Sequence, residues 1–354
     1  MSQRVLIIGA GLTGLALAAG LRARGVDPVV VEQAPIITEA GWAIALSERH
    51  LSALDRIGLT DRSDWPGYRA KQNLFFNGTT GLVEHVTSDG SGPLAFSRSE
   101  LQLAFLQPVK DLVRAGVQPS SVTDHGDTVE VTFDDGRHER FDAVIGADGI
   151  NSWTRRHVLD GPDATYAGCA TVRFQAPNTD NLTMTGGVDG DQAVLAYLLM
   201  DGGRRLHGVV FLPGEPDNRR ELSLPELADL FPHATGPMRS LINEMRHDPP
   251  SYYANIQQAV VPTWARNRVA IMGDAAHAMS PVLAQGAGVG LEDAALLADL
   301  LAMPHLPIPL ALASYQNIRK PPAQEIQTKS YQVTQALGSV RPGEMGDTLA
   351  GRDQ

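Results

Sequence analysis

Three glycines with a fixed spacing near the start of the chain are the first residues whose pattern points to chemistry. Gly9-Ala10-Gly11-Leu12-Thr13-Gly14 has the form G-x-G-x-x-G and lies between an apolar run, Val5–Ile8, and a predicted helix. In such a strand–turn–helix unit, glycines permit a tight turn and let backbone amides approach a pyrophosphate. Glu32 ends the next apolar run, where a carboxylate can accept hydrogen bonds from a ribose. The pattern predicts a dinucleotide site but does not separate FAD from NAD.

Two later segments share one design, because each is a short apolar run that leads into a glycine and an aspartate. Phe141–Ile145, apolar except for Asp142, leads into Asp148-Gly149, and Val269–Met272 leads into Gly273-Asp274. A further glycine-rich stretch, Gln285–Gly288, precedes a strongly apolar predicted helix. Continuous apolar runs of this kind are typical of buried parallel strands. The chain is therefore expected to return to one nucleotide domain near residues 5, 142 and 269.

In their order and spacing, these motifs resemble those of the FAD-dependent monooxygenases of the para-hydroxybenzoate hydroxylase type, the class A flavoprotein hydroxylases. The resemblance spans roughly residues 4–330 and implies one non-covalently bound FAD, with NAD(P)H as co-substrate. The residues that it assigns to cofactor binding are Gly9, Gly11, Leu12, Thr13, Gly14, Glu32, Gln33, Arg98, Gln102, Asp148, Gly149, Asp274, Pro281, Gly286, Ala287 and Gly288.

The resemblance also implies where these residues lie along the FAD. The first glycines hold the pyrophosphate and Glu32 the ribose, while Arg98 contacts the phosphate and ribityl region. Asp274 binds the ribityl chain, Pro281 lies beside the isoalloxazine, and Gly286–Gly288 place backbone N–H groups near flavin N1. Reduced flavin carries negative charge at N1, and backbone donors at a helix N-terminus stabilise an anion there.

For activity, the resemblance implies that NAD(P)H reduces the FAD and that O2 then forms a C4a-hydroperoxyflavin. This species hydroxylates or epoxidises a small organic substrate, aromatic or polycyclic. No second strand–G-x-G-x-x-G–helix unit serves the nicotinamide, as in that family. Three alternatives on the same fold are a flavin-dependent halogenase, a reductase or dehydrogenase, and a flavoprotein cyclase without redox chemistry. The halogenase signature needs two tryptophans two residues apart, and no pair here has that spacing: Trp42, Trp65, Trp153 and Trp264.

Two positions depart from the family pattern. Ala284 stands where the family usually has the first glycine of Gly-Gln-Gly, and Val289 stands where some relatives have a polar residue. An alanine has less backbone freedom than a glycine, so the flavin loop is expected to be less flexible here. Neither departure touches the first glycine motif, which leaves the expectation of FAD binding unchanged.

The candidate catalytic residues are Pro281, His277 and Tyr197. A histidine in the position of His277 could act as a general base, but in this motif it more often orders the flavin loop. Tyr197 lies on a predicted strand and either lines the substrate pocket or faces the core. Three arginines on predicted strands either anchor an acidic substrate or lie on the surface: Arg173, Arg204 and Arg205.

Composition narrows the classes of partner. The 354-residue chain has a net charge of −11, which repels phosphate backbones and anionic lipids, so neither nucleic acid nor a membrane is an expected partner. The expected partners are a small-molecule substrate and O2, with the chain acting as a monomer or homodimer. The single cysteine, Cys169, excludes an intrachain disulfide and fits a cytoplasmic location. Asp61, Asp64 and His50 lack the spacing of metal ligands, so no metal is expected.

The elements that must position these residues predict an α/β fold. A Rossmann-like FAD-binding domain, with a GR2-type βαβ unit, a parallel sheet and a three-stranded meander, is interleaved with a substrate domain. The substrate domain is a mainly antiparallel β-sheet, and helices follow at the C-terminus. The expected division is residues 1–66, 97–163 and 263–337 for the FAD-binding domain, 67–96 and 164–262 for the substrate domain, and 338–354 for a flexible tail.

Three local predictions follow from apolar periodicity and turn residues. Ser97–Ala115 is predicted as one helix, and Leu310–Leu337 as a helix interrupted at Pro321-Pro322. Val129–Phe133 and Arg140–Ile145 are predicted as strands of a hairpin around the turn signal Asp134-Asp135-Gly136.

Overall fold

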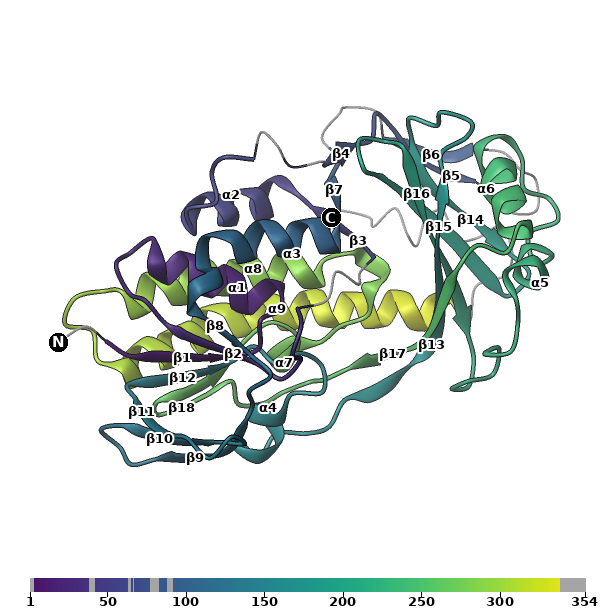
Figure 1. Ribbon diagram of the computed structural model, residues 1–354. Coiled ribbons are helices and arrows are strands. Elements are labelled where there is room, and N and C mark those ends of the chain that lie inside the picture. The colour runs from purple at the N-terminus through teal and green to yellow at the C-terminus, as the bar shows by residue number, and fades with distance from the viewer. Residues whose placement is uncertain are drawn as a thin grey trace.

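The computed structural model of this chain describes residues 3–37, 42–62, 65, 67–76, 83–87 and 92–337, and only the backbone of 73–76 and 83–87. Residues 338–354, predicted as a flexible tail, lie outside the described residues. Figure 1 shows a parallel sheet covered by helices at one end of the molecule and a broad antiparallel sheet at the other. The long C-terminal helix α9 (Ile308–Leu337) extends from the first part to the second.

The parallel sheet brings the three predicted apolar runs together. Within the described residues its strand order is β18-β19-β12-β1-β2-β8, and only the β18–β19 pair is antiparallel. The strands are β1 (Val5–Ile8), β2 (Val29–Glu32), β8 (Val113–Ala115), β12 (Ala143–Gly146), β18 (Ala265–Arg266) and β19 (Val269–Ile271). Because β1, β12 and β19 are parallel neighbours, the loops that follow them meet at one edge of the sheet. The predicted Rossmann-like arrangement is confirmed.

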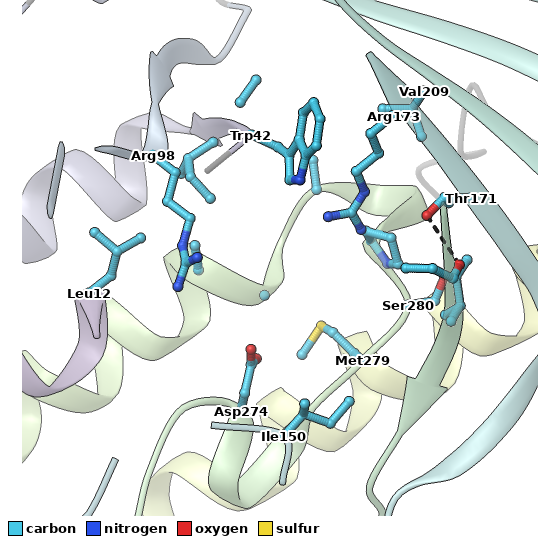
Figure 2. A pocket seen from close by; sticks show the side chains of 18 of the residues that line it. Leu12, Trp42, Arg98, Ile150, Thr171, Arg173, Val209, Asp274, Met279 and Ser280 are labelled. Atoms are coloured by element: carbon cyan, nitrogen blue, oxygen red, sulfur yellow. Dashed lines mark hydrogen bonds between the residues drawn. The ribbon is translucent and has the colours of Figure 1, made fainter. Parts of the chain in front are cut away.

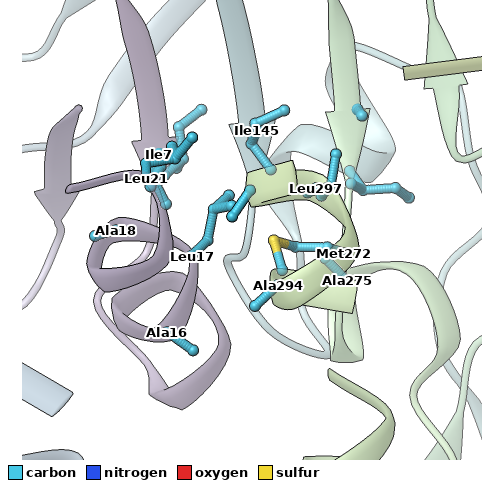
Figure 3. Packing of buried hydrophobic residues seen from close by; sticks show 14 of the residues in the cluster. Ile7, Ala16, Leu17, Ala18, Leu21, Ile145, Met272, Ala275, Ala294 and Leu297 are labelled. Atoms are coloured by element: carbon cyan, nitrogen blue, oxygen red, sulfur yellow. The ribbon is translucent and has the colours of Figure 1, made fainter. Parts of the chain in front are cut away.

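Helices cover one face of this sheet (Figure 1). The helices of this part of the molecule, short ones included, are α1 (Leu12–Arg22), α2 (Glu48–Arg56), α3 (Arg98–Leu106), the 3₁₀ helix η1 (Gln107–Leu112), α4 (Trp153–His157), α7 (Asp274–His277), the 3₁₀ helix η2 (Pro281–Leu283) and α8 (Gly286–Leu301). Small residues let α1 and α8 approach closely, since a Cβ on Gly20 would lie 2.9 Å from Cβ of Ala298. Figure 3 shows apolar side chains of both helices, among them Leu17 and Leu297, gathered in the buried core beside Ile145.

The meander is formed by β9 (Pro119–Asp124), β10 (Val129–Phe133) and β11 (His138–Phe141), all antiparallel. The turn at Asp134-Asp135-Gly136 is confirmed, with φ +84° at Gly136. The prediction of one strand over Arg140–Ile145 was wrong. The run divides at Asp142, whose backbone N–H and carboxylate both bind the backbone of Arg4 beside β1. That contact moves the following residues from the meander into the parallel sheet as β12.

The predicted helix over Ser97–Ala115 is too long. Helix α3 ends at Leu106, the chain tightens into η1, and Val113–Ala115 pairs with β2 as strand β8. The edge of β2 offers unpaired backbone donors and acceptors, and β8 satisfies them. Tertiary pairing therefore overrides the local helical pattern at this edge.

Helix α9 is continuous across Pro321-Pro322, where an interruption was predicted. Each proline removes an amide donor and normally bends or ends a helix. Here polar side chains on both sides of the pair bind the segment around β18. The side-chain oxygen Oε1 of Gln316 accepts from the backbone N–H of Trp264 at 2.7 Å, and Nε2 of Gln327 donates to the backbone carbonyl of Ala259 at 2.9 Å. These contacts hold the helix on its neighbours despite the missing donors.

The antiparallel sheet has the order β17-β13-β16-β15-β14-β5-β6 among the described residues, with β14 and β5 parallel. Its strands are β5 (Asn73–Phe76), β6 (Val83–Thr87), β13 (Thr165–Pro177), β14 (Thr185–Gly190), β15 (Ala193–Met200), β16 (Arg205–Pro213) and β17 (Ser251–Gln258). Helices α5 (Leu224–Ala228) and α6 (Gly236–Arg246) cover one face and enclose a second apolar core. The other face looks toward the loops of the parallel sheet.

A small sheet links the two parts. It consists of β3 (Ala43–Leu46), β7 (Leu94–Ser97) and β4 (Tyr68–Arg69), with β7 in the middle. Helix α3 follows β7 directly, so this sheet fixes where α3 begins. Among the described helices, none combines the length and apolar character needed to cross a membrane.

Candidate active site

The first glycine motif forms the turn between β1 and α1. The surroundings that a side chain would meet differ between its three glycines. Gly9 has φ +108°, and an added Cβ would lie 2.4 Å from the carbonyl oxygen of Ala147. A Cβ on Gly14 would lie 2.0 Å from the carbonyl oxygen of Gly9. A Cβ on Gly11 would meet no atom of the described residues within 4 Å. Packing therefore requires Gly9 and Gly14, whereas Gly11 leaves open space at the amino end of α1.

Ala10, between the first two glycines, is held from both sides. Its N–H donates to Oε2 of Glu32 at 2.8 Å, and its carbonyl accepts from Nε2 of Gln102 at 3.0 Å. The second oxygen of Glu32 accepts from the N–H of Ala34 at 3.0 Å. A carboxylate has about four lone-pair positions, so Glu32 can still accept from a ribose while it orders the turn. Gln33 is exposed beside it.

The side chain of Asp148 is used inside the protein. Its carboxylate accepts from Oγ of Ser152 at 2.5 Å and from N and Oγ1 of Thr154 at 2.8 and 2.9 Å. These bonds fix the turn between β12 and α4, and Gly149 in that turn has φ +75°. The Asp-Gly pair thus shapes the loop through Asp148 and presents backbone through Gly149.

A cavity of about 480 Å³ lies between the loops of the parallel sheet and the antiparallel sheet. One side, which we call the loop end, is formed by the segments that follow β1, β12 and β19. The predicted cofactor residues that line it are Gly11, Leu12, Thr13, Arg98, Gly149, Asp274, Pro281, Gly286 and Ala287. The opposite side, the sheet end, is lined by Thr171, Arg173, Leu198, His207, Val209 and Phe211. Figure 2 shows labelled side chains from both ends around this space.

Two opposite charges face the loop end. Arg98 opens α3 and Asp274 opens α7, and Figure 2 shows both side chains directed into the cavity. Neither side chain has a hydrogen-bond or ion-pair partner among the described residues. An unpaired guanidinium is suited to phosphate and an unpaired carboxylate to hydroxyl donors. The sequence motifs therefore identified a cation and an anion that the fold leaves free.

Helix α8 begins at the same place. Its first helical hydrogen bond runs from the N–H of Val289 to the carbonyl of Gln285, at 3.0 Å. The amides of the preceding first turn, Gly286–Gly288, therefore have no helical partner and carry the positive end of the helix dipole. Gly286 and Ala287 line the cavity. Gly288 does not, and a Cβ there would lie 2.2 Å from Nδ1 of His50, so its small size serves packing.

Of the three candidate catalytic residues, only Pro281 lines the cavity. His277 is fully buried, and its Nε2 donates to Oδ2 of Asp293 at 2.6 Å. Tyr197 is 2% exposed and belongs to the apolar core under α5 and α6, on the face of the sheet away from the cavity. The structure corrects the catalytic roles considered for His277 and Tyr197, because neither side chain reaches the space where a substrate would react.

Of the three arginines considered for substrate binding, Arg173 lines the cavity. Arg204 is ion-paired with Asp201, and Nη2 of Arg205 donates to Oε1 of Gln175 at 2.6 Å, both on the exposed surface. The guanidinium of Arg173 has no hydrogen-bond partner in the part of the chain that the structure describes. Burial lowers its pKa, and the neighbouring charge of Arg98 adds to the effect.

Two cavity residues were missed in the sequence. His207 is 3% exposed, and its Nδ1 has no hydrogen-bond partner among the described residues. Burial, together with the charge of Arg173, lowers its pKa to about 3. The ring of Trp42 lies 5.5 Å from the His207 ring and 6.2 Å from that of Tyr252. The alternation of cavity-facing residues on β16 was the available signal for His207, but it looks like any other half-buried strand.

Among the described residues, no group of three or more histidine, cysteine or acidic side chains is arranged so that it could hold a metal ion.

Comparisons with known proteins agree with this geometry. The sequence model of the FAD binding domain family matches residues 2–330. The 2-heptyl-3-hydroxy-4(1H)-quinolone synthase of Pseudomonas aeruginosa is 31% identical, over 92% of this chain and 87% of that protein. The 6-hydroxynicotinate 3-monooxygenase of Pseudomonas fluorescens is 29% identical, over 94% and 91%. The crystal structure of Klebsiella pneumoniae HpxO complexed with FAD and uric acid superposes with a TM-score of 0.84, at 24% identity over 98% and 97% of the two chains.

Proposed function

This chain belongs to the FAD-dependent monooxygenases of the class A flavoprotein hydroxylase family, and from that premise we propose that it transfers one oxygen atom of O2 to a small, planar aromatic substrate with an anionic group. The observation that carries the substrate part of the proposal is the unpaired guanidinium of Arg173. It lies at the sheet end of the cavity, opposite the loops that hold the cofactor.

The residues at the loop end fit FAD. Gly11 leaves space where a pyrophosphate would reach the amino end of α1, and a Cβ would fill that space. Arg98 supplies a cation for the phosphates, and Asp274 can accept from the ribityl hydroxyls. The amides of Gly286 and Ala287 can stabilise negative charge on the flavin ring. When bound, FAD supplies the redox chemistry, taking a hydride from NAD(P)H and passing electrons to O2.

The sheet end fits a small acid. Arg173 can bind a carboxylate or phenolate in a charge-assisted pair, and the hydroxyl of Thr171 lies beside it. The lowered pKa of His207 keeps its ring neutral at physiological pH, so it can exchange a hydrogen bond with a substrate without adding charge. Leu198, Val209 and Phe211 form the apolar walls, which exclude water from the reacting atoms.

We propose that one chain provides the whole site, so that the working form is a monomer or a homodimer with two independent sites. A cytoplasmic location would provide the NAD(P)H that the reaction consumes. The experiment that identifies the substrate also distinguishes NADH from NADPH and hydroxylation from epoxidation.

The test uses matched aromatic acids and amides with the FAD-loaded protein. We expect the acid, and not the amide, to stimulate NAD(P)H oxidation and O2 uptake, with a product heavier by one oxygen atom. Arg173→Met should raise KM for the acid about 10- to 100-fold, because it removes a charge-assisted hydrogen bond. The matched control is Arg205→Met. Arg205 lies in the same antiparallel sheet but outside the cavity, so this change should leave KM for the acid unchanged.

Two results would overturn the proposal. Equal stimulation by acids and amides would remove the role of Arg173 in recognition. Substrate turnover that proceeds without O2 would replace the monooxygenase assignment with a reductase or dehydrogenase.

A further inference from the structure

A buried carboxylate, Asp293 of α8, joins the two elements that form the floor of the loop end. Asp293 is fully buried. Its Oδ2 accepts from the backbone N–H of Gly273 at 3.1 Å and from Nε2 of His277 at 2.6 Å. Gly273 directly precedes Asp274, and His277 ends the same short helix, α7. One carboxylate on α8 therefore fixes both ends of the helix that carries Asp274.

Arg319 of α9 binds the same carboxylate through its other oxygen. Its Nε donates to Oδ1 of Asp293 at 2.8 Å, and its Nη2 lies 2.8 Å from Oε2 of Glu292. The same Nη2 donates to the carbonyl of Val289 at 3.2 Å, in the first turns of α8. Arg319 thus binds the part of α8 that follows Gly286 and Ala287. No side chain of this group lines the cavity itself.

The charges in the group are close to balance. Burial alone would raise the pKa of Asp293, but His277 and Arg319 outweigh that effect and hold the pKa below its ordinary value. Glu292 shares its second oxygen with Nε of Arg49 at 2.8 Å. Two carboxylates and two guanidiniums therefore compensate one another behind the loop end. Removal of one member leaves a net charge in a poorly solvated place.

The geometry points to Asp293 and Arg319 as a pair of positioning residues that set both the affinity for FAD and its reduction potential. They act on affinity by fixing Asp274 and the amino end of α8 relative to each other. They act on potential because the charge left by breaking the pair would lie behind the amides that face the flavin ring. Reduced flavin is anionic, so an added negative charge disfavours reduction and an added positive charge favours it. The inference rests on FAD binding and not on the identity of the substrate.

A purely structural brace would also bury charges in this way, but it predicts different behaviour. A brace changes the stability of the fold and leaves the flavin potential of folded protein unchanged. A positioning pair shifts the potential in opposite directions when opposite members are replaced. The sign of the shift therefore separates the two explanations.

The experiment compares Arg319→Gln and Asp293→Asn in the FAD-loaded protein. We expect FAD to dissociate about tenfold more readily from each, as for a lost charge-assisted hydrogen bond. The midpoint potential should fall in Arg319→Gln and rise in Asp293→Asn. Combining both changes removes both charges, so the double variant should return the potential toward that of the unchanged protein. Spectroelectrochemistry gives the potential, and equilibrium dialysis with flavin fluorescence gives the dissociation constant.

The matched control is Asp299→Asn. Asp299 lies on the same helix, pairs with two arginines, Arg24 and Arg56, where Asp293 pairs with Arg319 and His277, and does not line the cavity. It should lower thermal stability and leave FAD affinity and potential unchanged. If Arg319→Gln does not fold, Asp293→Asn and the double variant still decide the question. Shifts of the same sign in the two single variants, or no shift in either, would overturn the inference.

Discussion

The two ends of the cavity are built from different parts of the chain. At the loop end, glycines in the turns that follow parallel strands line the cavity beside the side chains of Arg98 and Asp274, and Gly11 leaves open space where any other residue would place a Cβ. At the sheet end, the lining is side chains that project from β13, β15 and β16, among them Arg173 and His207. A site made of backbone fixes which residue types fit at each position. A site made of side chains can change its chemistry by substitution while the sheet stays the same.

The largest expected effect on stability is at Gly14, and it should be absent at Gly11 of the same motif. Gly14→Ala would place a Cβ 2.0 Å from the carbonyl oxygen of Gly9, and relief requires movement of backbone. We expect a loss of about 3 kcal/mol or more in the free energy of unfolding, measured by urea denaturation. Gly11→Ala meets no described atom, so it should change stability by less than about 1 kcal/mol.

The same Gly11→Ala variant should bind FAD at least about tenfold more weakly, because its methyl group occupies the space of the pyrophosphate. FAD content per chain, from the visible absorbance of the purified protein, measures this. If Gly11→Ala retained full flavin, the loop end would not be a backbone-defined nucleotide site. A Gly14→Ala protein of unchanged stability would contradict the packing argument.

Acid should destabilise the fold through two buried histidines, His207 in the cavity and His50 in α2. The pKa of His207 at the sheet end is lowered to about 3, and burial with the charges of Arg49 and Arg319 lowers that of His50, which packs against Gly288 of α8, to about 4. Folding opposes protonation of both rings, so their contribution to stability is fully present above the unfolded value of about 6.5 and is lost as pH falls below it. Between about pH 7.5 and about pH 5, each ring should cost about 2 kcal/mol.

Replacing each histidine by asparagine assigns this loss to one ring or the other. His207→Asn and His50→Asn should each reduce the loss of stability between about pH 7.5 and about pH 5 by about 2 kcal/mol, whatever they do to stability at neutral pH. Denaturant unfolding across the pH range measures the slope. A slope unchanged by both substitutions would mean that other groups cause the acid loss.

Asp274 tests the loop end with a side chain instead of backbone. Asp274→Ala removes an unpaired carboxylate that faces the cavity, and the loss of one charge-assisted hydrogen bond should weaken FAD binding by about 1–3 kcal/mol. Asp229→Ala, which removes a carboxylate paired with Arg246 on the far helices, controls for the change in net charge. Equal flavin occupancy in both variants, measured by absorbance at saturating and limiting FAD, would remove Asp274 from the site.

The difference between the ends also explains which residues could be predicted from the sequence. Gly9 and Gly14 have few substitutes, because tight packing excludes a Cβ, and Gly11 lies between them in a spacing that is visible in one sequence. His207 and Trp42 carry no such constraint. Their position in the cavity depends on how β16 and β3 are placed against other elements, which a local pattern does not contain.

Helices and strands likewise differ in how far the local sequence predicts them. The buried strands β1, β12 and β19 were predictable because buried parallel strands are built from continuous apolar runs. Strand β8 was not, since it pairs with the edge of β2 and its residues alone favour a helix. The continuity of α9 across Pro321-Pro322 likewise depends on contacts with residues far away in the sequence. Local rules failed where tertiary contacts decided the outcome.

The smallest effect concerns Ala284, the departure from the family's Gly-Gln-Gly. Ala284 ends η2 in the left-handed conformation, with φ +53° and ψ +27°, just before α8. This conformation costs a non-glycine residue about 1 kcal/mol, but glycine loses more entropy on folding, so Ala284→Gly should change stability by less than about 1 kcal/mol. His305→Gly is the matched control, because His305 is exposed, has φ +65° and lies away from the cavity. The two variants should have similar stability, yet only Ala284→Gly should loosen FAD, by about twofold, because it frees the turn that leads into the amides of α8. Flavin dissociation rates measured side by side give the comparison. If His305→Gly loosened FAD equally, the effect would belong to the whole fold, and the backbone of the loop end would lose the special role that separates it from the sheet end.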